Sequence, residues 1–109
     1  MEEQVRQLTS LADVLIFGSS CEACSFILLD YLSSGRPIVC SDYPTMMELA
    51  GDAALYVDPL SPQAWKRAML ETLAGGEPVR RRAERAVARA RCFSWEECAA
   101  RTFEALTQW

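Results

Sequence analysis

Histidine is absent from the 109-residue chain. This absence excludes Ser-His-Asp and Cys-His catalysis and every metal site that uses a histidine ligand. A general base would therefore have to be a carboxylate, a lysine or a group on the substrate. An excess of positive charge is also lacking, because the formal net charge is −4. General nucleic-acid binding, which needs clustered cations to neutralise phosphates, is not expected at this net charge.

Long hydrophobic runs are missing too, and no apolar segment is long enough to cross a membrane. We expect no secretory leader, and the odd number of cysteines, five, does not suit a framework of disulfides. We therefore expect a cytoplasmic protein. The arginines at 80, 81, 82, 85, 89 and 91 could attract anionic lipid head groups, but a solvated helix face explains them as well, and we favour that interpretation.

Three short apolar segments are each closed by small polar residues. They cover residues 13–17, 38–40 and 53–57, and they are followed by Gly-Ser-Ser, Ser-Asp and Asp-Pro. Such runs are typical of parallel strands that are covered on both faces. Helical segments at 26–32 and 44–50 separate them. Gly35 fits the position just after the first of these helices, where a left-handed conformation costs least without a Cβ. The order β-α-β-α-β predicts an α/β fold with a small parallel sheet and right-handed crossovers.

Three further helices are predicted after the last strand. Ser61 with Pro62, Pro78, and Ser94 with Glu97 mark their starts, the last pair at capping-box spacing. The first helix has apolar residues at roughly helical spacing, Trp65, Ala68, Met69 and Leu73, and the second has one face formed by Val79, Ala83, Ala86, Val87 and Ala90. Four arginines of the second helix should point away: Arg80, Arg81, Arg85 and Arg89.

The loop after the first strand is the richest candidate site. Ligands of open parallel sheets bind outside the carboxyl ends of the strands, and residues 18–25 connect such an end directly to a helix. The start of that helix offers unpaired N–H groups and a positive dipole end, which would stabilise a diphosphate. Glu22 and Asp30 lie eight residues apart there. Their carboxylates could accept hydrogen bonds from sugar hydroxyls.

Five segments of the chain together form a recognisable pattern: residues 12–19, 21–22, 28–41, 51–59 and 93–96. In these segments and their order, the chain resembles family 4 glycosyltransferases along nearly its whole length. The resemblance implies half of the carboxyl-terminal, donor-binding domain of a GT-B enzyme, with a small Rossmann-like sheet. Residues 1–93 would form this partial donor domain and residues 94–109 a crossover helix. The amino-terminal acceptor domain would be missing, so we expect a fragment that is inactive alone.

The resemblance also implies site residues and a reaction. Glu22 would contact the donor sugar as the catalytic position, and Asp30 would hold ribose hydroxyls where the family has a glutamate. The intervening residues that would lie against the sugar and diphosphate are Ala23, Cys24, Ser25 and Phe26. Transfer would be retaining, from a nucleotide sugar to a hydroxyl acceptor, with no metal or other cofactor. The aspartate is one methylene shorter than glutamate, and small polar residues replace the family's loop glycines.

Several alternatives stay open at this stage. The chain could be a non-catalytic module that binds a nucleotide or a partner subunit, or a different parallel α/β protein. Cys21-x-x-Cys24 permits a zinc or redox interpretation, but we favour small, partly buried filler residues. Trp65 is expected in the core, and Glu48 in a capping or loop-fixing role.

The last helix is expected to bind a partner. One of its faces carries Trp95, Cys98, Thr102, Leu106 and Trp109. An uncovered face of this kind favours association. We expect it to contact the missing amino-terminal domain or a second copy of the chain.

Overall fold

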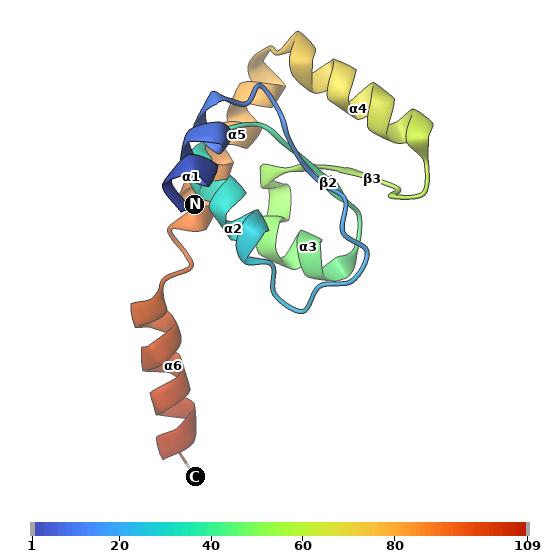
Figure 1. The fold of residues 1–109 in the computed structure, drawn as a ribbon. Helices are drawn as coiled ribbons and strands as arrows, with labels where there is room; N and C mark the ends of the chain where they lie inside the picture. Colours follow the sequence, from blue (N-terminus) through green and yellow to red (C-terminus); the bar gives the residue numbers. More distant parts are fainter. Residues whose placement is uncertain (1, 109) are drawn as a thin grey trace.

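A small parallel sheet lies at the centre of the computed structural model, which describes residues 2–108. Within that range three strands run in the order β1 (Leu15–Phe17), β2 (Ile38–Ser41) and β3 (Leu55–Val57) (Figure 1). Leu15 is opposite Ile38 in the register, and Val39 is opposite Leu55. The predicted parallel β-α-β-α-β arrangement is confirmed. The first and last strands are shorter than the apolar runs suggested.

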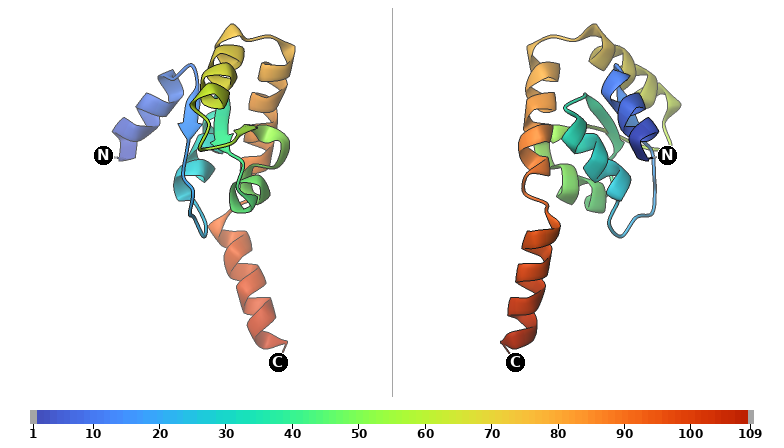
Figure 2. Two further views of the ribbon diagram at one scale, coloured as in Figure 1. Left: turned by 90° about the vertical axis from the view of Figure 1, so that its right-hand side faces the viewer. Right: turned by 60° about the vertical axis from the view of Figure 1, so that its left-hand side comes forward.

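Helices surround this sheet in the expected order. They are α1 (Glu2–Leu11), α2 (Phe26–Ser34), α3 (Pro44–Ala50), α4 (Pro62–Ala74), α5 (Glu77–Ala90) and α6 (Trp95–Thr107), with the 3₁₀ turn η1 (Gly51–Ala53) before β3. Figure 2 shows α4 across the sheet from α2, α3 and α5. The larger apolar cluster joins α2, α3 and α5 to the side chains of Leu15, Phe17, Ile38 and Cys40. Val39 and Val57 meet Ala68 of α4 in a smaller cluster on the other face.

The helix ends follow the sequence signals. Ser61 and Ser94 accept hydrogen bonds from the N–H groups of Ala64 and Glu97, as N-caps do. Gly35 ends α2 in the left-handed region with φ of 73°, where a residue with a Cβ is strained. Only half of the predicted capping box forms. The Glu97 carboxylate pairs with Arg101 of the next turn instead of reaching back to the Ser94 N–H.

Leu73 does not share the buried face of α4, although it lies at roughly helical spacing from Trp65 and Met69. It is 54% exposed, and Thr72 is buried beside Ala68 in its place. The two buried positions are four residues apart and therefore share one face of α4, whereas Leu73 is rotated a further 100° around the axis. The Thr72 hydroxyl donates to the Ala68 carbonyl at 2.7 Å, which satisfies its buried polar group. Trp65 is half-buried against the smaller cluster.

Arg89 was wrongly predicted to point away from the core. Its Nε donates to the Leu49 carbonyl at 2.9 Å and its Nη2 to the Glu48 carbonyl at 2.7 Å. These carbonyls belong to the last turn of α3, where backbone acceptors have no helical partner and the dipole attracts cations. Arg89 therefore joins α5 to the end of α3. The Glu48 side chain itself is exposed.

The last helix projects from the body of the molecule, as Figures 1 and 2 show. Every described residue of α6 is exposed, including Trp95, Phe103 and Leu106. Its first residue contacts the body, because the Trp95 and Phe26 rings lie 6.0 Å apart between centroids. Trp109, which was assigned to the same face, lies outside the described residues. The division of the chain at residue 93 stays a prediction.

None of the helices in residues 2–108 combines the length and the apolar character that a membrane span requires.

Candidate functional site

The carboxyl ends of the strands meet at one edge of the sheet. The buried Ser41 hydroxyl, at the end of β2, donates to the Ser19 carbonyl after β1 at 2.6 Å. The Asp42 N–H donates to the Val57 carbonyl at the end of β3 at 3.0 Å. The three predicted loops therefore share this edge, which is where ligands of open parallel sheets bind.

Glu22 lies in the loop before α2 and is held there. Its Oε1 accepts a hydrogen bond from the Ser19 hydroxyl at 3.0 Å, and the same hydroxyl accepts from the Cys21 N–H at 3.4 Å. Glu22 is half-buried, in contrast to the exposed Cys21 and Ala23 on either side. The loop thus folds back on itself and fixes the position of one carboxylate near the end of β1.

The amino end of α2 is capped by its own side chain. The buried Ser25 hydroxyl accepts from the Leu28 N–H at 3.1 Å, and the first regular helical bond runs from Leu29 to the Ser25 carbonyl. This cap occupies one of the N–H groups that the sequence predicted as free. The N–H groups of Phe26 and Ile27 precede the first helical bond and lie at the positive end of the dipole. Anion binding at this end would therefore depend on those two groups.

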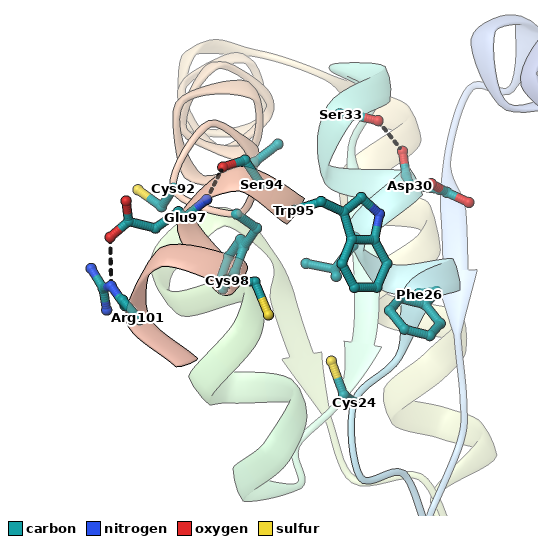
Figure 3. A pocket seen from close by; sticks show the side chains of 13 residues that line it. Cys24, Phe26, Asp30, Ser33, Cys92, Ser94, Trp95, Glu97, Cys98 and Arg101 are labelled. Atoms are coloured by element: carbon teal, nitrogen blue, oxygen red, sulfur yellow. Dashed lines mark hydrogen bonds and ion pairs between the residues drawn. The ribbon is translucent and has the colours of Figure 1, made fainter. Parts of the chain in front are cut away.

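Asp30 lies on the exposed side of α2 and lines a cavity of about 510 Å³ (Figure 3). Cys24 and Phe26 line the same cavity, so the structure brings together three of the six predicted donor residues. Glu22, Ala23 and Ser25 are not among its lining residues within the described chain. Asp30 also borders a second cavity of about 630 Å³ between α1 and α2.

The far wall of the first cavity was not predicted as part of the site. It comes from the segment after α5 and from the first turns of α6, and includes Phe93, Trp95, Cys98 and Arg101. The Arg89 guanidinium lies 5.1 Å from the centroid of the Phe93 ring and helps to hold that segment. The available signal is the motif Phe93-Ser94-Trp95-Glu96. It predicts the start of an apolar helix and resembles a segment of the family, but neither property places it at the donor site.

Contrary to the expectation from the sequence, Cys21 and Cys24 do not fill partly buried positions. Cys21 and Cys24 are exposed, so partial burial was wrong for both. Loops beyond strand ends have little packing around them, which explains the exposure. Cys40 is buried in β2, and burial raises the pKa of its thiol to about 11. Within residues 2–108, no group of three cysteine or carboxylate side chains could hold a metal ion.

Comparison with known proteins identifies the class to which this fold and loop belong. Residues 1–89 match the family described as glycosyl transferases group 1. The chain belongs to this family. A solved structure of sucrose-phosphate synthase from Thermosynechococcus elongatus superposes with a TM-score of 0.84 at 21% identity, over 97% of this chain and 27% of that one. The fold is therefore that of a GT-B glycosyltransferase domain.

A curated relative is more similar in sequence. The chain is 31% identical over 104 residues to O-antigen chain mannosyltransferase B of Escherichia coli. This alignment covers 95% of the chain and 27% of the relative. The chain thus spans about a quarter of the length of each of these two proteins.

Proposed function

We propose that this chain forms the donor-binding part of a retaining glycosyltransferase, which transfers sugar from a nucleoside diphosphate to a hydroxyl acceptor. The observation that carries the proposal is the loop at residues 18–25. It runs from the carboxyl end of β1 directly into the amino end of α2 and is fixed to β2 through the Ser41–Ser19 hydrogen bond. In a member of the glycosyl transferases group 1 family, this is the expected position of a donor.

The diphosphate would bind at the start of α2. The Phe26 and Ile27 N–H groups and the dipole stabilise negative charge there, and the charge on the diphosphate grows as the bond to the sugar breaks. No metal ion is needed for this role in the proposal. Binding of the diphosphate should therefore be unchanged by EDTA.

The two carboxylates would bind different parts of the donor. Glu22, positioned by the Ser19 hydroxyl, would accept hydrogen bonds from the sugar. Asp30 lies five residues beyond Ser25, about 7.5 Å further along the helix axis. It would accept hydrogen bonds from the ribose hydroxyls. The backbone from Ala23 to Phe26 would lie between these two groups, against the sugar and the diphosphate.

Transfer would require a second domain that binds the acceptor, because the chain spans only 27% of its mannosyltransferase relative. The exposed apolar residues of α6, which include Trp95 and Leu106, offer a surface for that domain. Sedimentation velocity of Leu106→Glu and of the unmodified chain tests whether a second copy occupies this face instead. In that case only the unmodified chain would sediment as a dimer.

Titration calorimetry with UDP, GDP and ADP tests the donor site. We expect one of them to bind, and we expect Asp30→Asn to weaken it by about tenfold, since a ribose hydrogen bond to a charged acceptor is lost. Asp13→Asn is the matched control, because Asp13 is exposed at the opposite end of β1. Equal losses in the two variants, or no binding by the unmodified chain, would reject the site.

Glu22→Gln separates the sugar from the nucleotide. The similarity to a mannosyltransferase makes a mannosyl nucleotide the first donor to test. We expect the variant to bind this sugar nucleotide more weakly and the corresponding free diphosphate with unchanged affinity. A nucleotide-binding module without a sugar site would show no such difference.

A further inference from the structure

Two thiols from distant parts of the sequence face the same cavity. Cys24 lies in the loop before α2, and Cys98 lies on the first turn of α6. Both are exposed, and neither is paired in a disulfide. Figure 3 shows their sulfur atoms directed toward each other across the cavity. Neither thiol has a part in the proposed transfer reaction, so their placement needs a separate account.

The neighbouring aromatic contact holds these thiols in the same region. Phe26, two residues after Cys24, lies with its ring centroid 6.0 Å from that of Trp95. Trp95 precedes Cys98 by three residues, so the two share one face of α6 and differ by about 4.5 Å along its axis. The contact that attaches α6 to the body is therefore also the contact that brings Cys98 toward Cys24.

The other exposed cysteines are placed differently. Cys21 is in the same loop as Cys24 but does not line this cavity. Cys92 also lines it, yet its Sγ is directed to the Ala88 carbonyl at 3.9 Å, in the last turn of α5. Cys40 is fully buried in the sheet. Among the described thiols, the geometry therefore selects the pair Cys24 and Cys98.

We propose that Cys24 and Cys98 form a disulfide-forming pair that joins the loop before α2 to α6. The oxidant is a small-molecule disulfide such as glutathione disulfide. The thiolate of one cysteine attacks it, forms a mixed disulfide and releases one glutathione thiol. The second cysteine then attacks the mixed disulfide, forms the Cys24–Cys98 bond and releases a second glutathione thiol. Two protein thiols are oxidised while one glutathione disulfide is reduced to two thiols.

Formation of the bond depends on the position of α6. A disulfide requires Cα atoms about 4.4–6.8 Å apart. All described residues of α6 are exposed, so few packing contacts oppose a rotation of the helix about the segment from Arg91 to Ser94. Formation of the bond would hold a projecting helix against the body. The same bond would restrain the loop that contains Glu22.

The test uses two double variants of the same chain. Cys21→Ser with Cys92→Ser keeps the proposed pair, whereas Cys24→Ser with Cys98→Ser is the matched control with the other two exposed thiols. Each variant is incubated at low micromolar protein concentration with glutathione disulfide. Accessible thiols and intact mass are then measured. We expect the first variant to lose both accessible thiols with a mass decrease of about 2 Da, reversed by dithiothreitol. The control should retain its thiols or carry glutathione.

Hydrogen exchange provides the second measurement. Amide exchange in α6 should slow by at least about tenfold in the oxidised first variant, since the helix no longer moves independently of the body. Retained glutathione on Cys24 or Cys98, a disulfide between two chains, or unchanged exchange in α6 would overturn the proposal. Neither measurement uses a nucleotide, so their outcome is independent of the proposed donor site.

Discussion

Replacing Arg89 by alanine should destabilise the fold more than is usual for a residue on a largely solvated helix. The guanidinium donates to the Leu49 carbonyl at 2.9 Å and to the Glu48 carbonyl at 2.7 Å, and it lies 5.1 Å from the Phe93 ring centroid. A hydrogen bond from a charged group contributes about 1.5–3 kcal/mol when shielded and less when exposed. The cation–π contact adds about 0.5–1 kcal/mol. We expect a total loss of about 2–3 kcal/mol.

Arg85→Ala is the matched control on the same helix. Arg85 forms an exposed ion pair with Asp52 at 3.7 Å, and such pairs contribute under about 1 kcal/mol. Urea unfolding followed by circular dichroism gives both free energies, and thermal unfolding should show a midpoint about 10 °C lower for Arg89→Ala. Arg89→Lys should be intermediate, because it keeps the charge but loses the planar pair of donors. If the Arg89 and Arg85 variants lost equal stability, the capping role of Arg89 would be refuted.

Two further predictions concern Gly35 at the end of α2 and the buried Cys40 in β2. Gly35→Ala should cost about 2 kcal/mol, because φ is 73° and the new Cβ would lie 3.2 Å from Val87 Cγ2. In a Val87→Ala background the penalty should fall to about 1 kcal/mol, and an equal penalty in both backgrounds would contradict the predicted clash. Burial raises the pKa of the Cys40 thiol from 9.0 to about 11, so the unfolded chain loses this proton at a lower pH than the folded chain does. The free energy of unfolding should therefore decrease as the pH rises from 9 to 11. The decrease is about 2 kcal/mol at pH 11, and urea unfolding of Cys40→Ala should show a smaller pH dependence, whereas the same dependence would exclude Cys40 as its source.

The sheet and its helices could be predicted because local signals agree with the fold. Short apolar runs marked the strands, and Gly35, Ser61 and Ser94 marked helix ends through their own backbone or side-chain chemistry. The direction of Arg89 could not be predicted in this way. Its acceptors are 40 and 41 residues away along the chain, and helical periodicity contains no information on them.

The candidate site, like the direction of Arg89, could be predicted from the sequence only in part. The loop at residues 18–25 and its position beyond β1 follow from strand order, but its internal contacts do not. The bond from Ser19 to Glu22 and the Ser25 cap arise from small polar side chains that have several possible partners nearby. The wall formed by Phe93, Trp95 and Cys98 depends on how α6 leaves the body, and sequence spacing does not determine that direction.

Amide chemical-shift mapping with UDP or GDP, whichever binds more tightly, tests the central claim most directly. A diphosphate held at the start of α2 should shift the amide signals of Phe26 and Ile27 most, with smaller changes in the loop from Ser19 to Ser25 and near Asp30. The largest shifts in α4 or in the second half of α6, with Phe26 and Ile27 unchanged, would contradict a donor site at this helix end.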